Sequence, residues 1–494
     1  MSKIAKMNTE SKKVVTRFAP SPTGFLHIGG VRTALFSYLY ARKMGGTFIL
    51  RIEDTDKVRE VEGSIDHIME SLQWLNIDWD YGPDKPGPFG SCIQSERLPS
   101  YQKYAKQLVE KGLAYPDPYT KEEVEQFRSD SEAQKKPFLF RNYRPETFEV
   151  WDGTKPLRLK VPEVKRYVWE DAVRGQLEAG EEMLDDIVLI KSDGYPTYNF
   201  AHIIDDLEMG VTHIMRADEF ISSQPKFLSI YDALEIPYPV FVSLPPILRD
   251  DRTKKLGKRD GAKDILDYRK EGYLPEAMFN FLALIGWNPG TEQELFTKEG
   301  LIETFDIERI QKSGGVFNEE KLKWLNKEHL NFLSATEYGE LVKEAIPDAI
   351  INTPSFDEDR LEKLMPVIRE RTHIMSDVTT AFEAGEYDFV FTDPDVSLDM
   401  LRFKKDPDVT SAGPRLQHLN ELLADADFSS SESIKAAVWD YAEKEGKGEV
   451  LWPMRVALTG LERSPDPFTV AYIIGQTDTL RRLQAAYDKI GHAI

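Results

Sequence analysis

The chain has 494 residues, of which 41% are hydrophobic and 30% charged, and its formal net charge at pH 7 is −21. This length predicts about three domains, and the composition is typical of a soluble globular protein. No apolar run reaches the roughly 18 residues of a membrane-spanning helix, and the polar N-terminal segment lacks the apolar stretch of a signal peptide. We therefore expect a cytoplasmic protein without a membrane partner. The single cysteine, Cys92, excludes internal disulfides and metal sites built from several cysteines.

The first predicted elements are a strand, a helix and a second strand. Residues 14–18 form a short apolar run that stops before two prolines, which cannot continue a central strand. From Val31 onward, apolar residues recur at helical spacing, which predicts a helix that ends before Gly45-Gly46. Residues 47–52 form the second predicted strand. Together these elements predict a βαβ unit with a right-handed crossover.

The turn between the first strand and the helix carries residues suited to phosphate binding. Gly24, Gly29 and Gly30 leave the backbone bare, and His27 lies where the helix begins. A helix N-terminus presents unpaired N–H groups and partial positive charge, so a phosphate can dock there. Glu53 follows the second strand, at the edge where open α/β sheets bind ligands. Taken alone, the same turn also fits a plainer interpretation, in which His27 caps the helix and the glycines turn the chain.

The α/β pattern is interrupted and then resumes. We expect a helix over 58–80, a Pro- and Gly-rich linker over 81–90, and an inserted subdomain that contains a helix at 101–111 and short strands such as 157–162. Further strands are predicted at 185–191, 210–216 and 240–244, and helices at 197–206 and 222–235. From Asp264 onward the pattern predicts helices only, at 274–286, 319–332, 336–345, 357–371, 414–425, 431–445 and 466–490.

Two downstream segments add charged groups near the ends of expected strands. The first is Arg216-Ala-Asp-Glu219, and the second is a dense basic stretch from Arg252 to Arg259 that includes Lys255 and Lys258. The acidic net charge argues against nonspecific nucleic-acid binding, but a local basic surface is enough for docking. A Lys-x-x-Lys pair on a glycine-containing loop can close over a triphosphate, although a charge run by itself is more often a solvated surface.

With these motifs in this order, the chain resembles the bacterial glutamyl-tRNA synthetases, a family of class I aminoacyl-tRNA synthetases. RFAPSPTGFLHIGG (17–30) is similar to that family's HIGH element, and KKLGKRDGA (254–262) is similar to its KMSKS loop. Further matching blocks are RIEDTD (51–56), DGYPTYNFA (193–201), RADE (216–219), WLNKEHL (324–330) and RVALTG (455–460). The resemblance covers roughly residues 14–490.

The resemblance implies an α/β fold with four parts. These are a Rossmann-like class I synthetase catalytic domain (13–83 and 193–250), an inserted α+β acceptor-stem-binding subdomain (84–192), a KMSKS-type loop with a helical junction domain (251–327), and an all-helical anticodon-binding region (328–494). In that last region Arg455 and Arg481-Arg482 are candidates for RNA contact.

The implied reaction is the ligation of L-glutamate to tRNA. The amino acid's α-carboxylate attacks the α-phosphorus of ATP, Mg²⁺ accompanies the nucleotide, and the acyl group then passes to the 3′ end of tRNA(Glu). We expect a monomer. Two alternatives stay open, an enzyme that also glutamylates tRNA(Gln) and, less favoured, a general nucleotidylyltransferase, which also uses a His-x-Gly-His turn.

The family's functional positions carry over to individual residues of this chain. The resemblance assigns catalysis to His27, Gly29, Gly30, Lys255 and Lys258. It assigns glutamate binding to Arg17, Ala19, Ser21, Glu53, Tyr198, His202 and Arg216. It assigns ATP binding to His27, Gly30, Glu219, Leu256 and Lys258. The chain departs from the family's pattern at two positions. Gly257 replaces the usual serine of the loop, and Phe220 stands where some members have tryptophan.

The segment after Tyr115 predicts that the purified protein holds no stoichiometric zinc. Some family members bind zinc through Cys-x-Cys there, whereas this chain has Asp117 and Tyr119 and only one cysteine in total. Elemental analysis of the purified protein tests this, and about one zinc per chain would contradict it.

Overall fold

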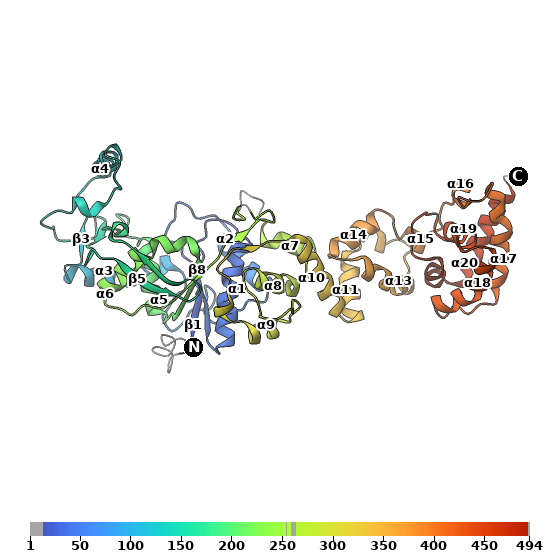
Figure 1. Cartoon of the computed structure of the whole chain (residues 1–494), viewed down its shortest axis with the longest axis horizontal. Helices are drawn as coiled ribbons and strands as arrows, with labels where there is room; N and C mark the ends of the chain where they lie inside the picture. Colours follow the sequence, from blue (N-terminus) through green and yellow to red (C-terminus); the bar gives the residue numbers. More distant parts are fainter. Residues whose placement is uncertain (1–12, 253, 258–262, 493–494) are drawn as a thin grey trace. The chain divides into compact units, whose positions relative to one another are not determined.

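The computed structural model describes residues 13–252, 254–257 and 263–492 (Figure 1). The chain forms two compact units. Of the described residues, the first comprises those up to Lys270 together with Pro275–Leu325, and the second comprises Glu271–Leu274 together with those from Asn326 on. In the part of the chain described, no helix is both long and apolar enough to cross a membrane.

The centre of the first unit contains two neighbouring sheets whose strands are mostly parallel. Strand β1 (Val15–Phe18) pairs in parallel with β2 (Thr47–Leu50), and β8 (His213–Ala217) pairs in parallel with β9 (Val240–Leu244). The Thr212 N–H donates to the Val15 carbonyl at 2.9 Å, and Arg17 Nη1 donates to the Met215 carbonyl at 3.3 Å. Strand β8 therefore lies beside β1 and runs in the same direction, which brings the ends of β1, β2 and β8 to one edge.

Helix α1 (Ile28–Lys43) makes the crossover from β1 to β2, as the periodicity predicted. Its buried side chains include Val31, Leu35 and Leu39, which recur at the spacing of one helical face. The predicted strands at 14–18 and 47–52 and the helix between them are thus confirmed as β1, α1 and β2. The predicted helix at 58–80 is shorter in the structure, where α2 spans Ser64–Trp74 and begins after Gly63 in a left-handed conformation.

The segment between residues 84 and 192 contributes to two sheets. Strands β3 (Ala114–Pro116), β4 (Leu157–Leu159) and β7 (Val188–Ile190) form a three-stranded antiparallel sheet. The hairpin of β5 (Tyr167–Asp171) and β6 (Gly175–Ala179) instead joins the other sheet, because Asp171 on β5 pairs with Phe241 on β9. That sheet has the order β6-β5-β9-β8. The remaining helices of the segment are α3 (Leu98–Glu110) and α4 (Lys121–Ala133).

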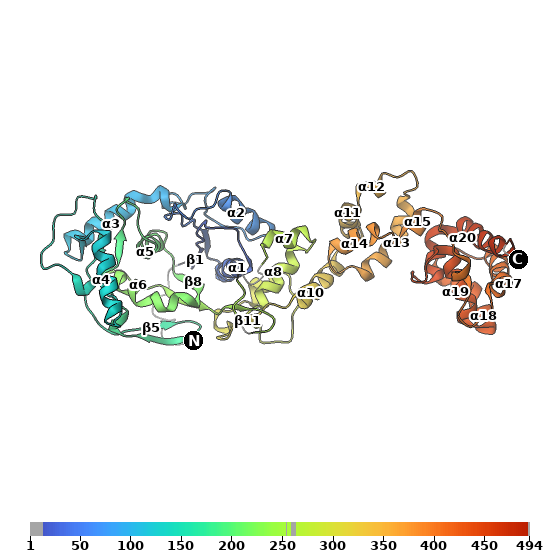
Figure 2. The same ribbon diagram turned by 90° about the horizontal axis from the view of Figure 1, so that it is seen from above.

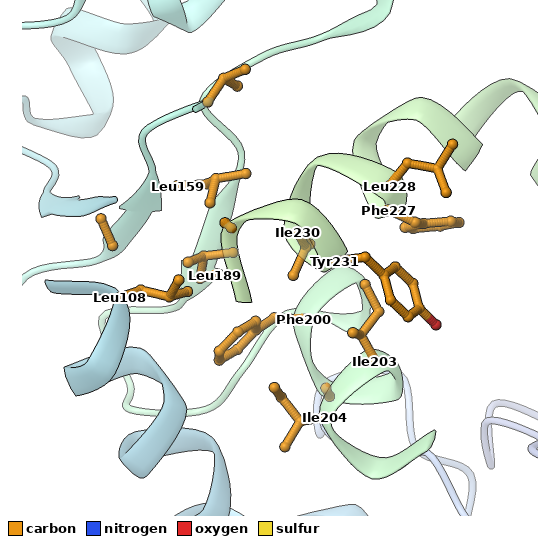
Figure 3. Close-up of a cluster of buried hydrophobic side chains, with 14 of the residues drawn as sticks. Leu108, Leu159, Leu189, Phe200, Ile203, Ile204, Phe227, Leu228, Ile230 and Tyr231 are labelled. Atoms are coloured by element: carbon orange, nitrogen blue, oxygen red, sulfur yellow. The ribbon is translucent and has the colours of Figure 1, made fainter. Parts of the chain in front are cut away.

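A large hydrophobic cluster unites these strands with three helices (Figure 3). Helix α5 (Tyr198–Glu208) contributes Phe200, Ile203 and Ile204, and α6 (Gln224–Leu234) contributes Phe227 and Ile230. The same cluster includes Leu108 from α3, Leu159 from β4 and Leu189 from β7. This core therefore anchors α5, the helix that carries Tyr198, His202 and Asp206.

The segment after residue 264 is not purely helical, contrary to the sequence prediction. Strand β11 (Gly315–Val316) pairs in parallel with β10 (Ile247–Leu248), a short interaction that hydrophobic periodicity does not reveal. Helices α7 (Ile265–Lys270), α8 (Pro275–Leu284) and α9 (Lys298–Thr304) complete the first unit, and α10 (Glu319–Phe332) begins in it and ends in the second.

Among its described residues, the second unit consists of helices (Figure 2). After α10 these are α11 (Ala335–Ala345), α12 (Asp348–Ile351), α13 (Glu358–Arg371), α14 (Met375–Glu383), α15 (Asp388–Phe391), α16 (Leu398–Leu401), α17 (Ala412–Ala424), α18 (Ser431–Glu445), α19 (Lys447–Thr459) and α20 (Pro467–Gly491). Five of the helices predicted from periodicity, 336–345, 357–371, 414–425, 431–445 and 466–490, correspond to α11, α13, α17, α18 and α20. Helix α19 was not predicted, and Pro453 lies inside it.

The turn between α1 and β2 provides a stability test with two neighbouring glycines. A Cβ at Gly46 would lie 2.3 Å from the Val14 carbonyl oxygen, which already accepts the Thr47 N–H. Gly45 has φ +58° with open space around it, so Gly45→Ala should cost only the backbone strain of about 1 kcal/mol. We expect Gly46→Ala to lower the free energy of unfolding by about 1–3 kcal/mol more than Gly45→Ala. Urea unfolding of both variants measures the difference, and equal losses would contradict it.

Candidate active site

His27 lies at the N-terminus of α1, where its side chain caps the helix. The Gly29 N–H donates to His27 Nδ1 at 3.1 Å, and the backbone of His27 is extended. A Cβ at Gly29 would lie 2.9 Å from the His27 ring, and one at Gly30 would lie 2.7 Å from Leu26 Cδ1. The plainer interpretation of this turn is therefore correct for His27, which caps the helix, whereas Gly29 and Gly30 lie inside α1 rather than in a turn, and Gly29 leaves room for the His27 ring. The cap does not compete with phosphate binding, because the same geometry orients the N-terminal end of α1.

The loop that leads from β1 to His27 is hydrogen-bonded to the segment that follows β2. The Glu53 N–H donates to the Pro20 carbonyl at 3.0 Å, and the Val61 N–H donates to the Pro22 carbonyl at 2.9 Å. Ala19 is half-buried and Ser21 is exposed in this loop. The backbone therefore brings Ala19 and Ser21 next to Glu53, as expected if all three contact one ligand.

Four charged side chains are buried together where β1, β2 and α5 meet. Asp206 Oδ1 accepts from Arg17 Nε at 3.0 Å and from Arg51 Nη1 at 2.6 Å. Arg51 Nη2 also donates to Glu53 Oε1 at 2.9 Å. Arg51 has no exposed surface, and the other three side chains are also buried. We define these four residues, Arg17, Arg51, Glu53 and Asp206, as the buried ion cluster.

The two carboxylates of the buried ion cluster differ in their electrostatics. Burial disfavours the charged form of Asp206, but the Arg17 and Arg51 guanidinium groups outweigh it and lower its pKa to about 2. Burial raises the pKa of Glu53 above its usual value, although Arg51 and Arg17 oppose the shift. Asp206 Oδ2 has no hydrogen-bond partner among the described residues. The cluster thus still has an acceptor to offer a ligand.

Arg216 is a buried cation at the end of β8 that lacks a carboxylate partner among the described residues. Its Nη2 donates to Gln224 Oε1, whereas Nη1 has no hydrogen-bond partner in the described part of the chain. Three aromatic rings surround the guanidinium, with centroids at 5.4 Å (Phe220), 4.7 Å (Phe227) and 5.9 Å (Phe241) from Cζ. Burial lowers the pKa of Arg216. A guanidinium in this setting is well suited to receive a carboxylate.

Tyr198 and His202 lie one turn apart on α5, and their rings stack with centroids 4.8 Å apart. His202 Nδ1–H donates to the Tyr198 carbonyl at 2.7 Å, and its ring also packs edge-on against Phe227. Burial lowers the pKa of His202 to about 3 and raises the pKa of Tyr198 to about 12. Both groups are therefore neutral near pH 7, so His202 forms an uncharged wall.

Lys255 and Glu219, which belong to separate sequence motifs, meet in the structure. Lys255 Nζ lies 2.5 Å from Glu219 Oε2, and both side chains are about half exposed. The Leu256 N–H donates to the Ile247 carbonyl at 2.8 Å, so β10 holds this part of the loop in place. Lys258, the second predicted lysine, lies outside the described residues. The structure thus joins the end of β8 to the basic loop at one accessible ion pair.

Three residues of this region were missed by the sequence analysis. Arg51 and Asp206 belong to the buried ion cluster, and Gln224 holds Arg216. Arg51 stands two positions before Glu53, and Asp206 lies one helical turn after His202, so strand and helix periodicity could have placed both at the site.

One RNA-contact candidate is wrong. Arg482 is buried and donates to the carbonyls of Phe389, Leu458 and Thr392, so it stabilises the second unit from inside. Arg481 is exposed and pairs with Asp393 and Asp478.

No group of three or more His, Cys, Asp or Glu side chains among the described residues could hold a metal ion.

Comparisons with known proteins define the class. The family described as "tRNA synthetases class I (E and Q), catalytic domain" matches residues 13–324, and that described as "Anticodon binding domain" matches residues 337–487. The chain therefore belongs to the class I tRNA synthetases of the E and Q group, which confirms the predicted fold class of a class I catalytic domain followed by a helical anticodon-binding region.

Within this class, the full-length relatives are glutamate–tRNA ligases. Those of Clostridium tetani and Clostridium novyi are 38% and 40% identical to the chain over 98% of its length and 99% of theirs. The crystal structure of a glutamate tRNA ligase from Elizabethkingia meningosepticum in complex with its amino acid has a TM-score of 0.86 and 34% identity, covering 97% of this chain and 100% of that one. The resemblance to glutamyl-tRNA synthetases is confirmed, and the general nucleotidylyltransferase is not favoured.

The neutral state of His202 predicts how stability depends on pH. With its pKa lowered from 6.5 to about 3 in the folded state, the unfolded chain binds a proton between these values that the folded chain does not. Stability is therefore lost as the pH falls through this window. Between pH 7 and pH 5 we expect wild type to lose about 2 kcal/mol more than His202→Asn, which retains a donor to the Tyr198 carbonyl. Urea unfolding at both pH values measures this, and equal losses would show that His202 titrates normally.

Proposed function

We propose that this protein is a glutamate–tRNA ligase that activates L-glutamate with ATP and transfers it to the 3′ end of tRNA(Glu). Its full-length relatives bear that name. The single observation in the site that carries the proposal is Arg216, a buried guanidinium without a carboxylate partner among the described residues. A buried cation is costly unless a ligand neutralises it, and a glutamate carboxylate is such a ligand.

The proposed glutamate site combines Arg216 with the buried ion cluster. Arg216 holds the side-chain carboxylate as a two-pronged donor, and Arg17 adds a second positive charge at the end of β1. Glu53 accepts a hydrogen bond from the ammonium group of glutamate. Ala19 and Ser21 lie beside Glu53, in the loop whose Pro20 carbonyl accepts from the Glu53 N–H. Tyr198 and His202 form the neutral wall against which the glutamate methylenes pack.

The proposed ATP site uses the start of α1 and the basic loop. His27, Gly29 and Gly30 present the N-terminal end of α1 to the phosphates. Glu219 and Leu256 contact the nucleoside, while Lys255 and Lys258 approach the phosphates from the loop. Lys255 pairs with Glu219 in this structure, so we expect the nucleotide to displace that exposed, weak pairing.

Mg²⁺ enters with ATP in this proposal. Since no cluster of three or more metal-binding side chains occurs among the described residues, ATP phosphates and water would supply most of its oxygen ligands. The ion would offset phosphate charge.

In the proposed reaction, one anion must attack another. The glutamate α-carboxylate attacks the α-phosphorus, pyrophosphate leaves, and the 3′-terminal adenosine hydroxyl of tRNA then displaces AMP from the acyl group. Fixed donors stabilise the charge that develops on the phosphates, and each one typically contributes about 3 kcal/mol. Holding the two substrates in line supplies the remaining rate acceleration, so no covalent enzyme intermediate is needed.

Charging assays test the proposed function directly. Purified protein should attach glutamate to tRNA(Glu) with ATP, and the absence of charging would contradict the proposal. The same assay on tRNA(Gln) determines whether a second tRNA is accepted, which stays a prediction, as does the monomeric state.

The arginines predict a clear pattern of amino-acid selectivity. Glutamine has nearly the shape of glutamate but would leave Arg216 buried beside an uncharged amide, so we expect strong rejection. Arg216→Gln should lower kcat/KM for glutamate by about 100-fold or more, with KM for ATP near the wild-type value. Arg17→Gln should also reduce glutamate activation far more than ATP affinity.

Pyrophosphate exchange with each amino acid, with and without tRNA, measures these effects. Arg166→Gln is a matched control, because the ion pair described for Arg166, with Glu178, is exposed. Glutamate activation near the wild-type level in Arg216→Gln would show that Arg216 is not the anchor.

A further inference from the structure

His67, on α2, lies between two segments that the proposed function uses. The Leu26 N–H donates to His67 Nδ1 at 3.3 Å, and Nε2 lies 2.9 and 2.8 Å from the two carboxylate oxygens of Asp264. The Phe25 ring stacks on the imidazole with centroids 4.5 Å apart. His67 is therefore held on one side by the turn before α1 and on the other by the start of α7.

These contacts fix the tautomer of the imidazole. A backbone N–H can only donate, so Nδ1 must be the unprotonated nitrogen that accepts from Leu26. The proton then resides on Nε2, from which it is donated to the Asp264 carboxylate. One neutral ring thus satisfies a donor in one segment and an acceptor in the other, a combination that needs both nitrogens.

The two segments are those that hold the proposed ATP-binding groups. Leu26 directly precedes His27, and Asp264 lies six positions after Lys258 in the sequence. The backbone joins them as well, since the Ile265 N–H donates to the Leu26 carbonyl at 3.2 Å and His27 pairs with Asp264 in an antiparallel bridge. Asp264 Oδ1 also accepts the Leu266 N–H at 2.9 Å and so fixes the start of α7.

We propose that His67 is a positioning residue for adenylate formation. It links the turn that contains His27 to Asp264, which follows the basic loop in the sequence. The inference rests on the proposed function. His67 contacts none of Arg17, Glu53 and Arg216 in the interactions described for it. Its loss should therefore reduce the rate of reaction at ATP while leaving glutamate binding intact.

Three substitutions separate the two contacts. His67→Asn keeps an acceptor near the position of Nδ1, His67→Gln keeps a donor near the position of Nε2, and His67→Ala removes both. We expect a fall in kcat for glutamate-dependent pyrophosphate exchange of about 10-fold to 100-fold in His67→Ala, because small misplacements of reacting groups have effects of that size. His67→Asn and His67→Gln should each recover only part of the rate, since each restores one side. KM for glutamate should stay at the wild-type value in all three.

Glu70→Gln is the matched control. Glu70 lies on the same helix and also links it to α7, through an exposed ion pair with Arg269 at 2.7 Å. An exposed pair contributes little, so this variant should match wild type. If His67→Ala fails to fold, His67→Asn and His67→Gln still decide the question.

The outcomes distinguish the inference from the proposed function. If wild type forms no glutamyl-adenylate with or without tRNA, the proposed function fails. If wild type is active and both His67→Asn and His67→Gln have wild-type kcat, the inference is overturned. It is also overturned if the variants lower only the melting temperature, or if KM for glutamate rises as much as kcat falls, because either result indicates a general structural role.

Discussion

The arrangement of the site depends on the burial of charge where β1, β2 and α5 meet. Arg51 is completely enclosed, and a guanidinium in that setting is tolerable only when carboxylates surround it. Asp206 and Glu53 fill that role, and Asp206 binds Arg17 as well. Removing one partner from such a group typically costs about 3–5 kcal/mol, because the others remain buried without compensation. The orientation of Arg17 and Glu53 is thereby fixed before any ligand arrives.

Helix α5 carries two consecutive buried aspartates that accept hydrogen bonds from different groups. Asp206 faces the buried ion cluster, whereas Asp205 accepts from Arg97 Nε at 2.7 Å, from the Tyr101 hydroxyl at 2.9 Å and from Gln94 Nε2 at 2.8 Å. Gln94 and Arg97 are the first and last residues of the short 3-10 helix that precedes α3, and Tyr101 lies within α3. The same turn of α5 therefore positions the strand ends and the first helix of the inserted segment. Arg216, in contrast, is buried without a carboxylate partner among the residues that the structure describes, and on the proposed function a glutamate carboxylate would balance its charge.

The spacing of apolar residues was sufficient to predict the βαβ unit and most of the long helices, because each helix or strand buries one face and its buried residues recur at the helical or strand period. The site residues came from a resemblance of motifs, and the structure brings Arg17 and Glu53 together in one cluster and Lys255 beside Glu219. Arg51 and Asp206 were not predicted, although their spacing from Glu53 and His202 places them on the same faces, because charged residues on a strand or a helix are more often solvated than buried. The pairing of β5 with β9 was equally hidden, because it joins Asp171 to Phe241 across a long separation in sequence.

That pairing also determines how the inserted segment can be manipulated or exchanged. An insertion held only by its two ends could be cut out or replaced by that of a relative, with the host sheet left whole. Here β5 supplies a neighbour for β9, and β6 forms the outer edge of the sheet. Excision of the segment would expose the backbone of β9 as a new edge, and unpaired edges promote association between chains. A chimaera that exchanges part of the segment should therefore keep Tyr167–Ala179 with the host, because the pairing of β5 with β9 makes this hairpin part of the host sheet.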